Sequence, residues 1–243
     1  MHPETMTFRR SCRCASGIAL LVVIASCVHS GAPATAGVGA PAMPAPATAA
    51  AFEPEIRAFE AADRLIPPAP GGIVFVGSSS VRLWPNLVGD FPDEPVLNRG
   101  FGGSTLPDVI YFAPRIVLPY RPRLVVLYAG DNDLAAGRTP EQVAADYTTF
   151  VRVVRDALPA TRVVFISIKP SPSRWAIHEQ MERANTLVAH AAGRDTLATF
   201  VDVYTPMLGA SGYPRPELYQ ADSLHMTAAG YALWRTRLTP VLH

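Results

Sequence analysis

The stretch Ile73-Val74-Phe75-Val76-Gly77-Ser78-Ser79-Ser80 joins an apolar run to a glycine and three consecutive serines. Its β-branched and aromatic residues predict a short buried strand. A glycine directly after the strand permits a sharp turn toward a helix, which lifts the next side chains to the edge of the sheet. A serine held at such a turn can act as a nucleophile, although Gly-Ser clusters more commonly form only turns.

Similar apolar runs recur along the chain and alternate with longer segments of helical spacing. The further strands are predicted at Pro95–Leu97, Leu124–Tyr128, Val163–Ile168 and Phe200–Val203. The helices are predicted at Phe52–Ile66, Leu106–Leu118, Pro140–Leu158, Arg174–Ala192 and Ala228–Leu238. Strands that alternate with helices indicate a parallel sheet covered on both faces. We therefore expect one α/β domain, a three-layer α/β/α sandwich with a mostly parallel five-stranded sheet.

The composition is that of an ordinary globular protein. Of the 243 residues, 49% are hydrophobic, which is enough for a full core. The formal net charge is +1, and the basic residues are scattered without a run of five or six. A nucleic-acid partner is therefore not expected.

The N-terminal region has the layout of a secretory signal peptide. Arg9 and Arg10 precede a short apolar stretch, Ala15–Ala25, which is too short to span a bilayer. Ile24–Cys27 resembles a lipobox, in which Cys27 would be acylated, and cleavage after the Ala34–Ala36 triplet remains the alternative. We expect an exported protein, either held in the cell envelope (periplasmic or membrane-anchored through Cys27) or secreted.

These features divide the chain into a signal peptide at residues 1–27, an Ala/Pro-rich tether at 28–51 and the folded domain at 52–243. The cysteines, Cys12, Cys14 and Cys27, all fall in the signal peptide. The predicted domain therefore contains no disulfide, no cysteine nucleophile and no thiol ligand for a metal.

Ligands of open parallel sheets bind beyond the carboxyl ends of the strands, so the residues after each run matter most. After the second run, Asn98–Ser104 forms a glycine-rich loop that either cradles an anion or is a tight turn. It lacks the spacing of a dinucleotide site, since Thr105 stands where the last glycine would be. After the third run, Gly130–Asp133 contains Asn132, either a turn former or an oxyanion donor.

Asp222 and His225 precede the final predicted helix at a spacing of three. At this spacing the carboxylate can accept the imidazole Nδ1–H and leave Nε2 to face a hydroxyl. The other histidines compete poorly for this role because of their positions. They lie in the leader or tether, in a predicted helix or at the last position, namely His2, His29, His178, His190 and His243. None has metal-ligand spacing, so neither a metal nor another cofactor is expected.

In this order and placement, the four elements resemble the signature blocks of the SGNH or GDSL-like hydrolases, over residues 70–240. The resemblance implies a flavodoxin-like fold, with Ser79, Asp222 and His225 as the catalytic triad. It also implies an oxyanion hole formed by the Ser79 N–H, the Gly103 N–H and the Asn132 side chain. The first block departs from the family pattern, because Ser78 replaces the usual Asp. Ser78 and Ser80 thus remain candidate nucleophiles, but the position after the strand favours Ser79.

The resemblance implies a serine esterase acting on a small-molecule, carbohydrate or lipid ester, with short-chain or O-acetyl esters preferred. An acyltransferase, a lysophospholipase or thioesterase, and a non-catalytic, surface-anchored binding module remain alternatives. Loops at Lys169–Trp175 and Gly209–Ala221 leave the same sheet edge, and their larger side chains either form pocket walls or only pack the loops. These residues are Trp175, Tyr213, Arg215 and Tyr219. Nothing in the sequence indicates an oligomeric state.

Overall fold

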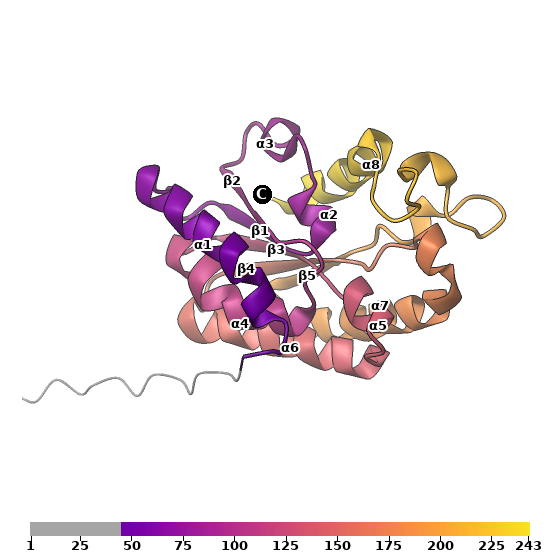
Figure 1. The fold of residues 1–243 in the computed structure, drawn as a ribbon, viewed down its shortest axis with the longest axis horizontal. Helices are drawn as coiled ribbons and strands as arrows, with labels where there is room; N and C mark the ends of the chain where they lie inside the picture. Colours follow the sequence, from indigo (N-terminus) through magenta and orange to yellow (C-terminus); the bar gives the residue numbers. More distant parts are fainter. Residues whose placement is uncertain (1–44) are drawn as a thin grey trace, which may run out of the picture. The chain divides into compact units, whose positions relative to one another are not determined.

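The computed structural model describes residues 45–243 (Figure 1). The predicted signal peptide, Cys27 and most of the predicted tether lie outside these residues. The strands are β1 (Ile73–Gly77), β2 (Val96–Gly100), β3 (Leu124–Tyr128), β4 (Arg162–Ile166) and β5 (Ala198–Val201). The α-helices are α1 (Ala49–Leu65), α2 (Ser79–Arg82), α3 (Leu87–Asp90), α4 (Leu106–Ile116), α5 (Asp131–Ala135), α6 (Pro140–Ala157), α7 (His178–Ala192) and α8 (Ala228–Leu238). Short 3-10 helices are η1 (Leu118–Tyr120), η2 (Pro172–Ile177), η3 (Thr205–Met207), η4 (Pro216–Leu218) and η5 (Thr239–Val241).

The strands form one parallel sheet in the order β2-β1-β3-β4-β5. β1 therefore lies between β2 and β3. Gly77, at the end of β1, pairs with Gly100 of β2 and with Tyr128 of β3. The carboxyl ends of these three strands consequently lie level at one edge of the sheet, where the residues predicted to carry the chemistry follow them.

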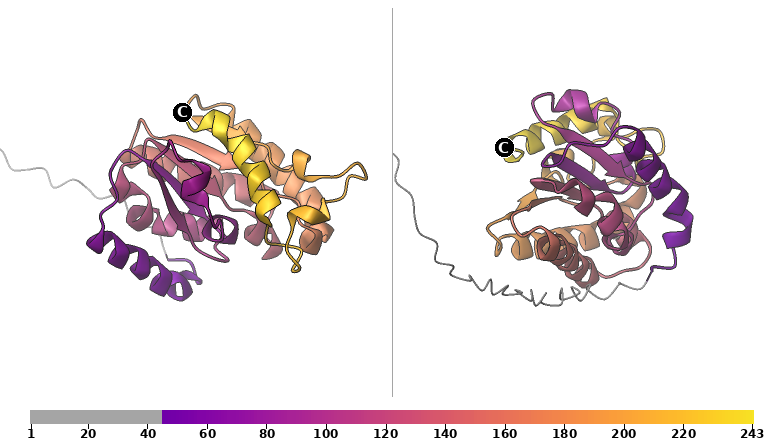
Figure 2. Two further views of the ribbon diagram at one scale, coloured as in Figure 1. Left: turned by 90° about the horizontal axis from the view of Figure 1, so that it is seen from above. Right: turned by 90° about the vertical axis from the view of Figure 1, so that its left-hand side faces the viewer.

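Helices cover both faces of the sheet, so the predicted three-layer sandwich is confirmed (Figure 1). Alternate side chains of β1 enter two different cores. Val74 and Val76 pack in a core with α1, α4, α6 and α7. Ile73 and Phe75 pack in the other core with α2, α3 and α8, including Trp234. In the right-hand view of Figure 2, yellow α8 and the pink and orange helices lie on opposite sides of the strands.

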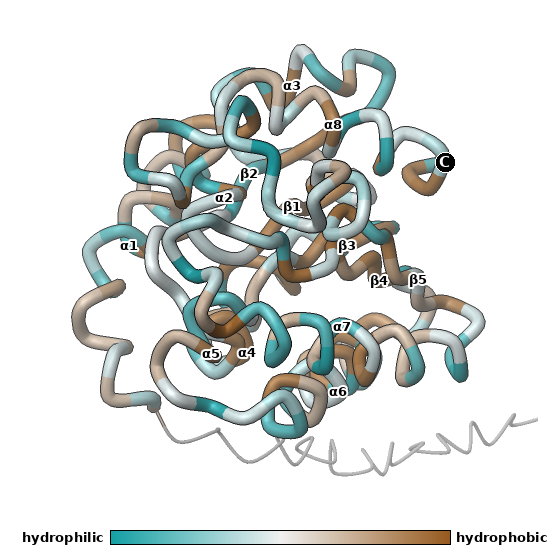
Figure 3. The backbone as a smooth tube through the Cα atoms, turned by 90° about the vertical axis from the view of Figure 1, so that its right-hand side faces the viewer, coloured by the Kyte–Doolittle hydropathy of each residue, from teal (hydrophilic) through white to brown (hydrophobic). Residues whose placement is uncertain are grey.

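The interior strands are almost continuously apolar, as expected for a sheet buried on both faces. All five residues of β3 are buried, as are those of β1. In Figure 3 the region of β3 and β4 is brown, the hydrophobic end of the scale. No helix within residues 45–243 is long and apolar enough to cross a membrane.

Several boundaries differ from the sequence prediction. The first helix begins at Ala49, three residues before the predicted start, because alanine favours a helix as readily as a tether. β2 runs to Gly100 rather than ending at Leu97, since its last residues pair with β1 despite their polarity. The helix predicted from Arg174 is a 3-10 segment, η2, followed by α7 from His178, with non-helical angles at Arg174 (φ −118°, ψ 19°).

Gly77 is required where β1 turns into α2. Its φ is +136°, a value that side chains rarely adopt, and an added Cβ would lie 1.8 Å from the carbonyl oxygen of Tyr128. The next residue, Ser78, donates its N–H to the same carbonyl at 3.0 Å. The close approach of this turn to β3 therefore excludes any side chain at position 77 and fixes where the serines emerge.

Candidate active site

The three serines after β1 have different surroundings. The hydroxyls of Ser78 and Ser80 are buried and have no hydrogen-bond partner within residues 45–243. The hydroxyl oxygen of Ser79 lies 3.1 Å from Nε2 of His225, which is 146 residues further along the chain. Only the middle hydroxyl of the three therefore contacts the imidazole.

Asp222 and His225 lie in one loop before α8. Oδ2 of Asp222 is 2.6 Å from Nδ1 of His225, and Oδ1 accepts the backbone N–H groups of Leu224 and His225, both at 2.9 Å. The bond from the Leu224 N–H, followed by the contacts with His225, lowers the pKa of Asp222 to about 2. Asp222 is therefore an anion at neutral pH, and it holds the ring so that Nε2 faces Ser79.

The backbone closes this loop tightly. Ser223 has a φ of 58°, which reverses the chain between Asp222 and His225. The N–H of Gln220 donates to the carbonyl of His225 at 2.7 Å, and an isolated antiparallel bridge joins Tyr219 to Met226. The spacing of three residues thus places acid and imidazole together through local bonds alone, as the sequence predicts.

The three predicted oxyanion donors follow three neighbouring strands, β1, β2 and β3. Within residues 45–243, neither the Ser79 N–H nor the Gly103 N–H donates to another residue. Gly103 is exposed, with a φ of 84°, and open space surrounds its α-carbon where a side chain would begin. The N–H of Phe101 donates to the carbonyl of Gly77 at 2.9 Å, which ties the glycine-rich loop to the end of β1.

Asn132 is the third predicted donor, and its amide makes two contacts. Nδ2 donates to the carbonyl of Ser104 at 3.0 Å, while Oδ1 accepts a bond from Nη2 of Arg174 at 2.8 Å. The first contact joins the loop after β3 to the loop after β2. The second brings in a residue that the sequence did not indicate as part of the site.

A buried ion cluster lies beside Asn132. Oδ2 of Asp131 is 3.0 Å from Nη1 of Arg174 and 3.4 Å from Nζ of Lys169, which is 1% exposed. Burial opposes ionisation of Asp131, yet the two cations hold its pKa below the ordinary value. Burial lowers the pKa of Lys169, and Asp131 acts against that shift. One signal was available in the sequence, because Lys169 is its only lysine and follows an apolar run.

Asp133 is a second link between the segment after β3 and the segment after β2. Its carboxylate is fully buried and accepts the N–H of Leu106, the first residue of α4, at 3.0 and 3.2 Å. Nε of Arg138 lies 3.7 Å away. Burial raises the pKa of Asp133 to about 7.

This shift predicts that stability falls as pH rises. Between the ordinary carboxyl pKa and about 7, the folded protein keeps a proton on Asp133 that the unfolded chain has released, so the free energy of unfolding decreases with pH. Asp133→Asn should flatten this dependence, because its side chain is neutral throughout. Urea unfolding at pH 4.5, 6 and 7.5 gives the change of the free energy of unfolding with pH for the parent and for the variant. Equal changes in the two proteins would contradict a raised pKa at Asp133.

The four residues predicted as pocket walls differ in their burial and contacts. The rings of Trp175 and Tyr213 meet edge to face with centroids 5.1 Å apart, and Trp175 also stacks on His178 at 4.2 Å. Tyr219 is buried, and its hydroxyl donates to the carbonyl of Pro170. Arg215 pairs with Glu217 at 2.8 Å. Trp175 and Tyr213 thus join the two predicted loops, whereas Tyr219 packs beneath them.

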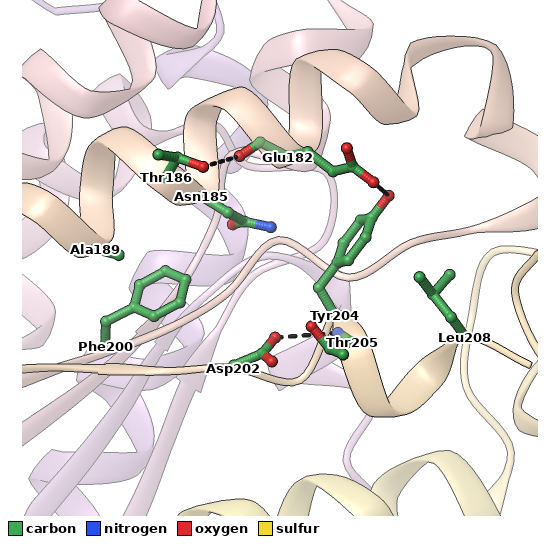
Figure 4. A pocket seen from close by; sticks show the side chains of 9 residues that line it. All are labelled: Glu182, Asn185, Thr186, Ala189, Phe200, Asp202, Tyr204, Thr205 and Leu208. Atoms are coloured by element: carbon green, nitrogen blue, oxygen red, sulfur yellow. Dashed lines mark hydrogen bonds between the residues drawn. The ribbon is translucent and has the colours of Figure 1, made fainter. Parts of the chain in front are cut away.

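A separate open pocket of about 530 Å³ lies between α7 and the edge strand β5 (Figure 4). Its wall includes Tyr204, whose hydroxyl donates to Glu182 at 3.0 Å, and Asp202, which accepts the N–H of Thr205. None of Ser79, Asp222 and His225 lines it. Within the part of the chain that the structure describes, no group of three or more His, Cys, Asp or Glu side chains could hold a metal ion.

This chain is similar in sequence or in fold to several known proteins. Platelet-activating factor acetylhydrolase IB subunit alpha2 of Gallus gallus is 25% identical over 173 residues, covering 66% of this chain and 71% of that protein. A GDSL-like lipase from Bacteroides thetaiotaomicron has the same fold, with a TM-score of 0.65 and 20% identity over 77% of this chain and 96% of its own. A catalytic mutant of an acetylxylan esterase from Geobacillus stearothermophilus superposes with a TM-score of 0.59 and 15% identity, covering 71% and 94% of the two chains.

The family model described as the GDSL-like Lipase/Acylhydrolase family matches residues 70–233. The matched region contains the turn after β1, the loops after β2 and β3, and the Asp222–His225 loop. The resemblance seen in the sequence is therefore confirmed. Because the match spans more than half of the sequence, this chain belongs to the GDSL-like lipase/acylhydrolase family of enzymes that hydrolyse ester bonds.

Proposed function

We propose that the protein is a serine esterase in which Ser79 is the nucleophile, His225 the general base and Asp222 the residue that orients it. The observation that carries the proposal is the position of the His225 ring. Its Nε2 is 3.1 Å from the Ser79 hydroxyl and its Nδ1 is 2.6 Å from the Asp222 carboxylate. This is the hydrogen-bonded series that activates a serine for acyl transfer.

The proposed reaction has two steps. His225 takes the proton from Ser79 as the oxygen attacks the ester carbonyl, and it then gives this proton to the leaving alcohol. His225 then deprotonates a water molecule, which attacks the acyl-enzyme. His225 returns that proton to the departing Ser79 oxygen, so the carboxylic acid and free Ser79 are released. Asp222 stays ionised throughout and stabilises the imidazolium that forms in each step.

The negative charge on the carbonyl oxygen needs donors that are in place before the reaction starts. We assign this role to the Ser79 N–H, the Gly103 N–H and one N–H of Asn132. The two backbone groups have no other acceptor within residues 45–243. The loops that carry the donors are tied together by the Asn132–Ser104 and Phe101–Gly77 hydrogen bonds.

We further propose that short-chain and O-acetyl esters are the preferred substrates. The names of two relatives, an acetylhydrolase and an acetylxylan esterase, support an acetyl group as the acyl part. Trp175 and Tyr213, in contact on the loops after β4 and β5, are candidate walls for the alcohol part, as aromatic side chains are for sugars and other small molecules.

We expect the purified protein to hydrolyse p-nitrophenyl acetate and butyrate with kcat/KM at least about tenfold above that for the octanoate. A fluorophosphonate probe should label the protein, and peptide mass spectrometry should locate the label on Ser79. Acetate release from an acetylated xylo-oligosaccharide tests the natural class of ester.

Each part of this proposal can fail separately. A preference for octanoate would contradict the short-chain assignment and favour a lipid ester. Transfer of the acyl group to an added alcohol in preference to water would indicate an acyltransferase. If the protein neither hydrolysed any of these esters nor reacted with the fluorophosphonate probe, the esterase proposal itself would be contradicted. A binding module would then be favoured.

A further inference from the structure

Arg174 is placed to act on the amide of Asn132. It lies in η2, between β4 and α7, and 42 residues separate it from Asn132 in the sequence. Its side chain is 19% exposed, and its guanidinium makes two contacts: Nη2 donates to Oδ1 of Asn132 at 2.8 Å, and Nη1 forms an ion pair with Oδ2 of Asp131 at 3.0 Å. Within residues 45–243, no other charged side chain makes a hydrogen bond to the side-chain amide of Asn132; Oδ1 of Asp131 accepts its backbone N–H at 3.0 Å.

We propose that Arg174, held by Asp131, is a positioning residue that orients and polarises the Asn132 amide for its part in the oxyanion hole. The inference rests on the proposed esterase function and deepens it. Arg174 acts through Asn132 and is not itself assigned a contact with the substrate.

The two contacts of the amide determine which way it faces. A guanidinium can only donate, so the atom that it meets must be the amide oxygen, and a carbonyl can only accept, so the atom facing Ser104 must be the amide nitrogen. A flipped amide would set donor against donor at Arg174 and acceptor against acceptor at Ser104. One Nδ2 hydrogen is used by Ser104, and the other has no acceptor within residues 45–243.

The charge on Arg174 should also strengthen that remaining donor. A cation that donates to the oxygen of an amide withdraws electron density from its nitrogen, so the N–H becomes a better donor to an oxyanion. Asp131 pairs with both Arg174 and Lys169, so its carboxylate helps to hold the guanidinium beside the amide.

The segment that carries Arg174 is itself held by the loop of the acid and the imidazole. The N–H of Ser173 donates to the carbonyl of Ser223 at 3.1 Å, and Ser223 lies between Asp222 and His225. The N–H of Arg174 donates to the carbonyl of Ser171 at 3.0 Å. Arg174 thus has a fixed backbone, and one short segment connects the acid–imidazole loop to the third oxyanion donor.

Arg174→Gln is expected to lower kcat for p-nitrophenyl acetate by about ten- to a hundredfold, the loss of one charge-assisted hydrogen bond, while KM changes less than about threefold. Binding of a trifluoromethyl ketone, which forms an oxyanion on the serine, should weaken by the same factor. Arg174→Lys should lie between parent and Arg174→Gln, because it keeps the charge but cannot span both acceptors. Arg183→Gln, which removes an exposed arginine on α7, is the matched control and should match the parent.

A double-mutant cycle separates positioning from independent effects. In the Asn132→Ala background, Arg174→Gln should cost no more than about twofold, since the amide through which it acts is absent. Equal losses in both backgrounds, or a rise in KM with kcat unchanged, would overturn the proposal and indicate that Arg174 contacts the substrate directly. Thermal unfolding of each variant shows whether a loss reflects misfolding, and added guanidinium should partly restore the kcat of Arg174→Ala.

A readout that does not depend on turnover keeps this inference separate from the esterase proposal. The side-chain amide resonances of Asn132 in a ¹⁵N-labelled protein should be sharp and shifted in the parent and should move toward free-amide values in Arg174→Gln. Unchanged resonances would overturn the positioning role even in an active esterase. If instead the resonances move but Ser79→Ala remains as active as the parent, the positioning stands and the proposed function fails.

Discussion

Ser79→Ala is expected to lower kcat/KM for p-nitrophenyl acetate by about 10⁴-fold or more. The substitution removes the only hydroxyl of the serine cluster that contacts Nε2 of His225. No acyl-enzyme can form without it, so the residual rate would come from water in a site that still holds the oxyanion donors. Initial rates at saturating and limiting ester, with the same batch of protein checked for folding by circular dichroism, give both kinetic constants.

The neighbouring serines provide matched controls for this experiment. Ser78→Ala and Ser80→Ala each remove a buried hydroxyl without a hydrogen-bond partner in the described part of the chain, so kcat/KM should stay within about threefold of the parent. They also test the departure of this sequence from the family pattern, in which Ser78 takes the place of an Asp. An active Ser79→Ala beside an inactive Ser78→Ala or Ser80→Ala would move the nucleophile to that position.

His225→Ala should cost on the order of 10⁴-fold in kcat, and the loss should depend on the leaving group. p-Nitrophenolate departs without a proton, whereas an ordinary alcohol must be protonated as it leaves. His225 is assigned both proton transfers, so its removal should slow the hydrolysis of an ethyl or sugar acetate more than that of p-nitrophenyl acetate. The ratio of the two rates in parent and variant measures the acid role separately from the base role.

Two further variants make this result specific. His190→Ala removes an exposed imidazole from α7 and should leave both rates unchanged. In the double variant Ser79→Ala, His225→Ala, the second substitution should add little, because the two side chains act as one unit. Additive losses would show that His225 acts separately from Ser79 and would contradict the proposed proton transfer.

Strand prediction succeeded where the apolar pattern was local and unbroken. β3 matches its predicted range, Leu124–Tyr128, at both ends, because every residue of this run is apolar and buried. β2 was predicted too short because Asn98 and Arg99 look like loop residues. Their partners lie far along the chain, since Arg99 binds Asp63 and the hydroxyl of Tyr120, and Asn98 donates to the carbonyl of Val81. A window of neighbouring residues contains no sign of such partners.

In the candidate site too, contacts between residues close in the sequence were predictable, and contacts between distant residues were not. The Asp222–His225 pair follows from its spacing, because four residues suffice to make the contact. The contact of His225 with Ser79 was predictable only from the resemblance to a family. Arg174 was missed altogether, since an arginine at the start of a predicted helix is ordinary and nothing near it in the sequence indicates Asn132. The short helices α3 and α5 lie outside the predicted helices, because four or five residues show no helical period.

The loop closed by the Tyr219–Met226 bridge carries the acid and the imidazole together, while the serine begins α2, directly after the turn from the buried strand β1. Turnover therefore requires contact between this loop and the turn after β1, and we expect the two segments to differ in their resistance to heat. A small loop held by a few backbone bonds opens at a lower free-energy cost than a buried parallel sheet. On warming, the loop with Asp222 and His225 should therefore open before the sheet unfolds. Inactivation should then precede global unfolding and reverse on cooling.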